Sequence, residues 1–463
     1  MLFLKELRTG ITGDLVKLVY DHYGPELSAL KMKYDRYTAT SLPIHNRDYG
    51  DMDEPDIEAA LNSDFFGEII GLKVGHFAGK PASYSYDKTR DEYEQAYDAL
   101  SRFQVVNNIA HIDAQTTKDA AICGKAYRLL YIDPEQELRV MTLKPYETVT
   151  VYENDATETE FAFRFYEIKQ VEGDSIVRAD VYDQSNMYEY VLTDDTFVLE
   201  KQRLHLFDYC PVIKYLNNDE ELGDADKVLS LIDAYDRTLS DMNAEITAFR
   251  MAYLAFLGGA ELTEEQVKLM RKIGAFTLPD GTDVKFIVKQ LLDTPIENHL
   301  NRLEANIYQF SNTPNMRDDS FSGNSSGISL RYKLSGIESK CLTFERIKTY
   351  TDMRQFKIAG SWWAKKKIAS IDAYSVIIQH HRNVPIDLNE IAEAVSKYVG
   401  ILPMEIILTL MPFIDDPEYV LDLIEQEKDS LRISDVSDGD EDVNDDEQVS
   451  EVPATSEEVA ATG

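Results

Sequence analysis

The stretch GHFAGKP (75–81) is the strongest candidate for nucleotide chemistry in the sequence. In a phosphate-binding loop, backbone N–H groups and a lysine hold the phosphate oxygens, and a serine or threonine binds magnesium. Here only three residues separate Gly75 from Gly79, and Pro81 stands where the magnesium ligand would be. We therefore expect Lys80 and Pro81 to end a helix rather than to bind a nucleotide.

Metal chemistry has weaker candidates. His111 lies two residues before Asp113, and His380 adjoins His381, but neither pair has a third partner at metal-ligand spacing. The acidic run at 435–447 lacks the glycine and the ligand spacing of a calcium loop. The three cysteines (Cys123, Cys210 and Cys341) are odd in number and lie far apart, which is typical of a reduced compartment. We expect no metal and no cofactor.

The loop SFSGNSSG (320–327) suits contact with a nucleic-acid backbone. Seven of its eight residues are Ser, Gly or Asn, and Gly323 and Gly327 would act as hinges at low conformational cost. Polar and cationic side chains in and beside it could meet phosphate oxygens without sequence preference; they are Arg317, Asn324, Ser325, Ser326, Arg331 and Lys333. By composition alone the loop fits a flexible linker equally well, and Arg331 and Lys333 fit a solvated helix face.

The overall charge excludes a protein that simply coats nucleic acid. The formal net charge of the 463 residues is -36, whereas a coat needs cations that displace phosphate counterions. The segment 430–463 is strongly acidic and lacks aromatic residues, so we expect a disordered tail. The N-terminal MLFLKELRTG is too charged for a signal peptide, and no apolar run reaches the ~20 residues of a membrane helix.

The first half of the chain predicts helices followed by a sheet. Helical patterns cover 11–40 (with a break at Gly24-Pro25), 62–79 and 90–124. Between 125 and 214 the pattern changes to alternation rich in aromatic and β-branched residues, separated by turn residues. This region predicts one antiparallel sheet of five or six strands.

Two heptad seams follow the predicted sheet. Apolar residues spaced alternately by four and three begin at Val228 and continue through Ile232, Tyr235, Leu239, Met242, Ile246, Phe249 and Tyr253. A second seam comprises Ile296, Leu300, Leu303, Ile307 and Phe310, and it begins with the capping box Thr294-Pro295-Ile296-Glu297. Between the seams we expect a short helix at 263–271 and two strands within 275–288, joined by a Pro-Asp-Gly turn.

After the Ser/Gly loop the sequence predicts only helices. A long one covers about 327–357, and others cover 362–380, 387–399, 404–412 and 416–428. The stretch SWWAKKK (361–367) combines aromatic and basic residues and could touch nucleic acid. A tryptophan pair facing the core, with a solvated lysine face, is the alternative that we favour.

Several stretches, in order, resemble the portal proteins of tailed bacteriophages, in the branch common in phages of Gram-positive hosts. They are NSDFFGEIIGLKVGHFAGKPASYSYD (62–87), AAICGKAYRLLYID (120–133), LKPYETVTVYEND (143–155), YCPVIKYLNNDEELGDADKVLSLIDAYDRTLSDMNAEITAF (209–249), FSGNSSGISLRYKLSGIESK (321–340) and MPFIDDPEYVLDLIEQE (411–427). No single phrase is diagnostic, and the resemblance lies in their order and spacing over about 20–428.

The resemblance implies an α+β, mostly helical, ring-forming subunit. Its parts would be a wing with an antiparallel β region (1–223), a first stem helix (224–252), a small α/β clip (253–293) and a second stem helix (294–312). A tunnel loop (313–327), a long helix behind it (328–361), a helical crown (362–429) and the acidic tail (430–463) would follow. At about 40 residues the clip is short for the family.

The resemblance also implies function. Portal subunits, usually twelve, form a ring at one capsid vertex of the virion, through which double-stranded DNA is packaged and ejected. The implied partners are the terminase large subunit, head-completion or adaptor proteins, and capsid and scaffolding proteins, with assembly in the host cytoplasm and no membrane. Such a protein is not an enzyme. An acidic tunnel fits this role, because it repels phosphates over a Debye length of ~8 Å and lets DNA slide.

Two other classes of protein stay open at this point. A packaging ATPase or translocase would need a phosphate loop followed by an acidic strand end, and we find neither. An acidic coiled-coil scaffold would explain the heptads, but the β region at 125–214 argues against it.

Overall fold

The computed structural model describes residues 4–46, 60–152, 158–170, 175–249, 253–257, 283–287, 293–317, 327–384, 388–409, 411, 414, 420–421 and 423–427. The chain divides into two compact units, Met1–Val384 and Pro385–Gly463. Several predicted features lie outside the described residues. They are the acidic tail, the short helix at 263–271, the strand before the Pro-Asp-Gly turn, and loop residues 318–326.

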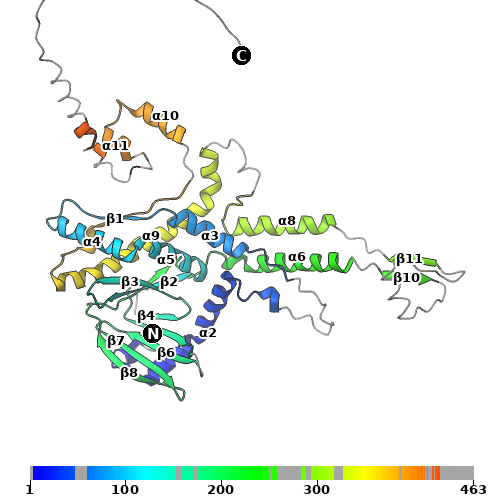
Figure 1. The fold of residues 1–463 in the computed structure, drawn as a ribbon, viewed down its shortest axis with the longest axis horizontal. Coiled ribbons are helices and arrows are strands. Elements are labelled where there is room, and N and C mark those ends of the chain that lie inside the picture. Colours follow the sequence, from blue (N-terminus) through cyan, green and yellow to red (C-terminus); the bar gives the residue numbers. More distant parts are fainter. Residues whose placement is uncertain are drawn as a thin grey trace, which may run out of the picture. The chain divides into compact units, whose positions relative to one another are not determined.

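The first unit begins with helices that follow the predicted positions closely (Figure 1). After α1 (Leu4–Leu7) come α2 (Gly13–Tyr37), a 3-10 turn (Pro43–Asn46) and α3 (Phe65–Ala78). The break predicted at Gly24-Pro25 is wrong, because α2 continues through Pro25. Its buried residues before and after the proline, Val19 and Leu27, pack into the core, and this packing offsets the ~3 kcal/mol that an interior proline costs.

The helical stretch predicted over 90–124 consists of two helices. α4 (Tyr93–Asn107) and α5 (Ile109–Cys123) meet at Asn108, which has a left-handed backbone with φ of 47°. Asparagine adopts this conformation more readily than most residues, so the chain can turn there. Gly124 ends α5, also with positive φ. A β-carbon at this position would collide with the backbone carbonyl of Glu221, so only glycine fits.

The β region forms two sheets, so the prediction of a single sheet is wrong. β2 (Lys125–Ile132) pairs antiparallel with both β3 (Leu138–Leu143) and β9 (Val212–Leu216). The second sheet is the antiparallel meander β4 (Thr148–Val151), β5 (Phe161–Ile168), β6 (Ile176–Tyr182), β7 (Asn186–Thr193) and β8 (Thr196–Leu204). Helix α2 packs on the second sheet through one shared core.

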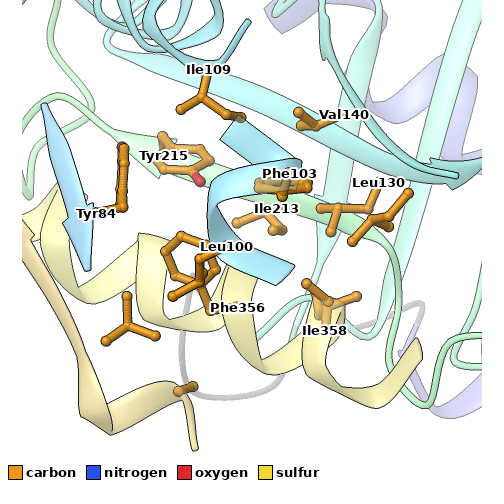
Figure 2. Close-up of a cluster of buried hydrophobic side chains, with 14 of the residues drawn as sticks. Tyr84, Leu100, Phe103, Ile109, Leu130, Val140, Ile213, Tyr215, Phe356 and Ile358 are labelled. Carbon is orange, nitrogen blue, oxygen red and sulfur yellow. The ribbon is translucent and has the colours of Figure 1, made fainter. Parts of the chain in front are cut away.

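The longest helix of the described chain is α9 (Gly327–Lys366). It passes the sheet of β2, β3 and β9 and shares its core with α4 and α5; Figure 2 shows the packing of Leu100, Phe103, Tyr215, Phe356 and Ile358. The helix predicted at 362–380 is wrong, because Trp362 and Trp363 belong to the end of α9. The chain then forms a 3-10 turn (Ala373–Ser375) and β12 (Val376–Gln379), which pairs with β1 (Ser83–Tyr86).

Two helices run side by side before α9: α6 (Leu229–Phe249, after a 3-10 turn at Asp226–Val228) and α8 (Asp293–Phe310) (Figure 1). Between them in sequence, β10 (Tyr253–Leu257) pairs antiparallel with β11 (Asp283–Ile287). Tyr253 therefore lies in a strand and not in the first seam. The second unit contains α10 (Leu388–Tyr398) and α11 (Met404–Thr409). The α+β class with antiparallel sheets is confirmed.

Candidate functional site

Aromatic rings join the start of α6 to the end of α8. These two helix ends lie together and are called the base of the α6–α8 pair. The ring centroid of Phe65, at the start of α3, lies 4.9 Å from that of Tyr235 on α6 and 5.8 Å from that of Tyr308 on α8, both edge-on. The hydroxyl of Tyr308 also donates a hydrogen bond of 2.9 Å to Glu68. Edge-on rings at these separations attract each other beyond their apolar burial, so α3 fixes both helices at the same end.

Ion pairs and backbone hydrogen bonds fix α6 further. Arg36 on α2 pairs with Asp233 at 2.6 Å, and Lys33 pairs with Asp226 at 2.6 Å just before α6. The backbone N–H of Ser63 donates a hydrogen bond of 3.0 Å to the carboxylate of Asp236. Asp236 is buried, and a buried carboxylate without a partner would be costly. The base of α6 thus has partners from α2 and from the segment before α3.

Seam residues of α6 and α8 are buried together near this base, and exposed seam residues occur at both ends of the helix pair. Ile232 and Ile307 are fully buried in one cluster, and Leu300 and Leu303 of α8 are also buried. Tyr235, Leu239 and Met242 are half-buried. Toward the far end of α6, Ile246 is 42% exposed, whereas Phe310, two residues after Tyr308 at the base, is 55% exposed. A single chain therefore covers only part of its heptad seam.

The segment after α8 turns back along that helix. Asn315 donates a hydrogen bond of 3.1 Å to Glu304 on α8 and accepts one of 3.0 Å from the backbone N–H of Arg317. The Arg317 side chain is exposed. Burial raises the pKa of Tyr235 and Tyr308, and the nearby Arg317 charge opposes that rise. Arg317 is the predicted DNA-contact residue that this geometry brings to the α6–α8 base.

The first half of α9 holds the same segment from the other side. Lys340 donates a hydrogen bond of 2.9 Å to the carbonyl of Ser311 and lies 3.6 Å from the buried carboxylate of Asp224. Burial lowers the pKa of Lys340. At Gly336, an added β-carbon would lie only 3.2 Å from the carbonyl of Asn312, so the helix and the segment approach closely there.

The remaining predicted loop residues are only partly described. Gly327 is the first residue of α9, Arg331 is exposed and Lys333 is half-buried. Gly323, Asn324, Ser325 and Ser326 lie outside the described residues. Tyr332, which the sequence did not single out, is 77% exposed between Arg331 and Lys333.

The other candidates have structural roles. The stretch 75–81 ends α3 at Ala78, with Gly79 as its C-cap, as predicted. Trp362 and Trp363 are buried while the lysines that follow are exposed, which confirms the favoured alternative. His381 lies 3.1 Å from Ser83, and burial lowers the pKa of His380. Among the residues that the structure describes, no group of three or more His, Cys, Asp and Glu could hold a metal ion.

Sequence reasoning missed a buried charge cluster on α9. Lys348 and Asp352 lie one turn apart in the middle of this helix and are fully buried with Arg128 of β2 and Asp113 of α5. A signal existed, because opposite charges four residues apart flanked by Phe344 and Phe356 are unusual for a solvated helix face. Asp113, considered above as a metal ligand, is an ion-pair partner instead.

Aromatic rings and ion pairs thus fix the paired helices α6 and α8, and a hydrogen bond of Lys340 ties the long helix α9 to the segment that follows them. The family model described as "Phage portal protein, SPP1 Gp6-like" matches residues 17–432, and the chain belongs to this family. Proteins of this family are structural rather than catalytic, are components of the virion capsid, and form an oligomeric ring at the capsid vertex.

Two curated relatives agree with the family assignment. The chain is 23% identical over 431 residues to the portal protein of Clostridium phage phiCD119, covering 85% of this chain and 90% of that protein. It is 22% identical over 415 residues to the portal protein of Bacillus phage SPP1, covering 82% of this chain and 79% of that protein. Within the described residues, no helix is both long and apolar enough to span a bilayer.

Proposed function

We propose that twelve copies of this phage portal protein form a ring whose bore conducts double-stranded DNA during packaging and ejection. In this proposal α6 and α8 form the stem, β10 and β11 belong to the clip, and residues 313–327 form a tunnel loop that reaches the DNA. The family match over residues 17–432 carries the proposal, and the charge and exposure of these elements support it.

The charge of the two helices suits a bore in which DNA slides. α6 carries four acidic residues and one arginine, and α8 carries three acidic residues and one arginine. An anionic wall repels phosphates from all sides within a Debye length of ~8 Å. DNA would then touch the wall only where a loop extends, which keeps its contacts few and weak.

Exposed seam residues at the two ends of the helix pair support contact between subunits. Ile246, toward the far end of α6, and Phe310, at the base end of α8, continue the heptad pattern beyond the residues that α6 and α8 bury between them. Large apolar side chains in a regular helical row usually pack against a partner helix. A neighbouring copy would bring such a helix in a closed ring.

The tunnel loop would contact the DNA backbone without reading sequence. Arg317 within the loop and Arg331 just after it are exposed, and Asn324, Ser325 and Ser326 would donate hydrogen bonds to phosphate oxygens. Gly323 and Gly327 would let the loop change shape as the DNA duplex moves past it. We further propose that the terminase large subunit and head-completion proteins dock on this ring, and that it assembles with capsid and scaffolding proteins in the host cytoplasm.

Deleting Ser322–Ser326 tests the role of the loop. We expect rings to assemble as in the wild type, because the described anchors of the segment lie at Ser311, Asn315 and Lys340. DNA packaging or retention should fall. Electron microscopy of the rings and the DNA content of purified heads are the two measurements, and loss of assembly would show that the loop is structural instead.

A further inference from the structure

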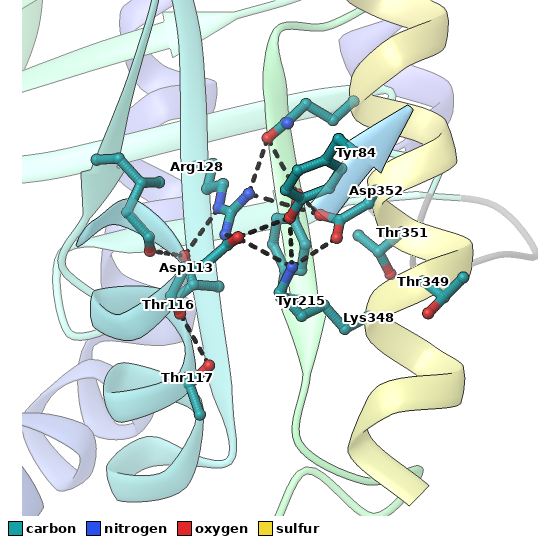
Figure 3. Close-up of polar contacts among 12 residues, drawn as sticks. Tyr84, Asp113, Thr116, Thr117, Arg128, Tyr215, Lys348, Thr349, Thr351 and Asp352 are labelled. Carbon is teal, nitrogen blue, oxygen red and sulfur yellow. Dashed lines mark hydrogen bonds and ion pairs between the residues drawn. The ribbon is translucent and has the colours of Figure 1, made fainter. Parts of the chain in front are cut away.

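Four charged side chains meet in the middle of the first unit, away from solvent. They are Asp113, Arg128, Lys348 and Asp352, and none of their side chains is more than 8% exposed. Two cations face two anions, so the cluster is balanced in charge. Figure 3 shows that it joins α5, β2 and α9, with Tyr84 of β1 and Tyr215 of β9 at its edge.

Each charge has several directional partners. Arg128 donates hydrogen bonds to Asp113 at 2.5 Å, Thr116 at 2.8 Å and Gln355 at 3.0 Å, and lies 3.5 Å from Asp352. Lys348 lies 2.9 Å from Asp113 and 2.5 Å from Asp352. All four charges are therefore paired in this arrangement of the elements, although the Nε2 of Gln355 has no hydrogen-bond partner among the described residues.

The two tyrosines close the network. The hydroxyl of Tyr84 donates a hydrogen bond of 2.6 Å to Asp113, and the hydroxyl of Tyr215 donates one of 2.9 Å to Asp352. Burial raises the pKa of both tyrosines, so they remain donors. Burial would also raise the pKa of Asp113, but Lys348 and Arg128 hold it below its ordinary value, so the carboxylate stays ionised.

α9 contributes three members of the network at intervals of four and three residues: Lys348, Asp352 and Gln355. If α9 moved along its axis by one turn, about 5 Å, Lys348 or Asp352 would take the place that Phe344 or Phe356 now has, against the ring of Phe77 or of Phe103. Apolar packing is not directional and tolerates such shifts, whereas a buried charge without a partner does not. A buried polar group that specifies register is the best-attested use of such groups.

We propose that the cluster of Asp113, Arg128, Lys348 and Asp352 sets the axial register of α9 relative to α5 and β2. Lys340 and Gly336 lie two to three turns before Lys348 on the same helix and contact Ser311 and Asn312. The register thereby fixes where the base of the tunnel loop lies. Only this last step rests on the proposed function.

Other ion pairs on α9 are less able to set the register. Arg382 contacts Glu338 at 3.0 Å and also Glu345, but these two carboxylates are 33% and 30% exposed. Lys365 pairs with Asp208 at 2.6 Å, and both side chains are about half exposed. Exposed pairs can exchange their partner for water at little cost.

The double variant Lys348→Met with Asp352→Leu removes the α9 charges and keeps the rest paired. Arg128 retains Asp113, Thr116 and Gln355, Tyr84 retains Asp113, and Tyr215 retains Gln355 at 3.2 Å. No unpaired buried charge remains to unfold the protein. Arg128→Met with Asp113→Leu is a second variant that removes the partners instead. The matched control is Lys17→Met with Asp21→Leu, a surface pair with the same spacing.

Spin labels at two exposed positions report the register, with Ser335→Cys on α9 and His111→Cys on α5. The native cysteines are buried, and burial raises their thiol pKa values to about 11 or 12, so they label poorly. Labelled chains are diluted into an excess of unlabelled chains, assembled without DNA, and measured by pulsed electron resonance. This readout does not depend on DNA contact.

We expect one narrow distance in the otherwise wild-type chain and in the Lys17/Asp21 control. Each double variant should instead give a second population or a mean displaced by about 5 Å, one helical turn. A distance distribution identical to that of the wild type in a folded double variant would overturn the proposal. If neither double variant folds, the cluster is a determinant of stability and the proposal is overturned as well.

Discussion

Lys340 of α9 donates a hydrogen bond of 2.9 Å to the backbone carbonyl of Ser311, across 29 residues of sequence that include the Ser/Gly loop. The base of the loop is thus held by the helix that follows it. The same lysine lies near Asp224, just before α6. One side chain therefore links α9, the segment after α8 and the approach to α6.

Replacing Lys340 by methionine should loosen the loop base without unfolding the protein. Burial already disfavours the charged form of Lys340, since it lowers the pKa, and Asp224 keeps Lys73 at 3.2 Å. We expect global stability to change by no more than about 1 kcal/mol. Amide hydrogen exchange at 311–313 should accelerate about tenfold. Lys365→Met is the matched control, because Lys365 donates a similar bond of 2.9 Å to Leu206 at the surface, and equal exchange in both variants would refute the link.

Removing only one charge of the α9 pair should be far more harmful than removing both. Lys348→Met leaves a surplus buried carboxylate, and Asp352→Leu leaves a surplus buried cation, so each should cost about 3–5 kcal/mol of unfolding free energy. The double variant should cost clearly less than the sum of the two. Denaturant unfolding of the three variants completes the cycle, and additive costs would show that the charges act independently.

Asp119, six residues after Asp113 on α5, should make stability depend on pH in the opposite sense to a paired carboxylate. Burial raises its pKa from 3.8 to about 6, and its Oδ1 has no hydrogen-bond partner. The folded state then binds more protons than the unfolded state between pH 4 and 6, so this residue's contribution to stability rises as pH falls through that window.

Asp119→Asn should therefore stabilise the protein at pH 8 by about 1–3 kcal/mol and flatten the stability profile between pH 4 and 6. Thermal unfolding across that range measures both effects. Asp98→Asn, an exposed change on α4, is the control. A variant that loses stability at pH 8 would mean that the charge of Asp119 has a favourable partner.

The exposed residues of the heptad seam, Ile246 and Phe310, should matter for assembly and not for the fold of one chain. Ile246→Ser with Phe310→Ser removes two large apolar side chains that one chain leaves 42% and 55% exposed. Each buried side chain of this size is worth ~1.5–3 kcal/mol, so ring formation should weaken at least tenfold. Sedimentation velocity gives the oligomer distribution. Val105→Ser, at a position 81% exposed, should have no effect, and intact rings in the double variant would exclude this contact.

Local sequence patterns located most helices and strands but not the partners of the strands. β2 pairs with β9, which begins 80 residues after β2 ends, and alternation along the chain carries no information about such long-range pairing. For the same reason the sequence predicts one sheet over 125–214, whereas the strands there form two. At Pro25, tertiary packing overrides the local signal.

For the candidate site, spacing predicted which residues of α6 and α8 lie on the seam, because heptads report one helix face. Spacing could not predict how much of that seam one chain covers, and Ile246 shows that burial ends before the pattern does. The cluster of Arg128 and Lys348 depends on side chains 220 residues apart, which no local pattern brings together.

In the proposed function, the subunits form a ring with an anionic bore, and a loop from each copy enters that bore. A density map of the assembled particle by electron cryomicroscopy tests it most directly. We predict a closed ring with α6 and α8 around the axis and residues 313–327 nearest to it. A map with these residues on the outer rim, or particles without a central channel, would contradict the account.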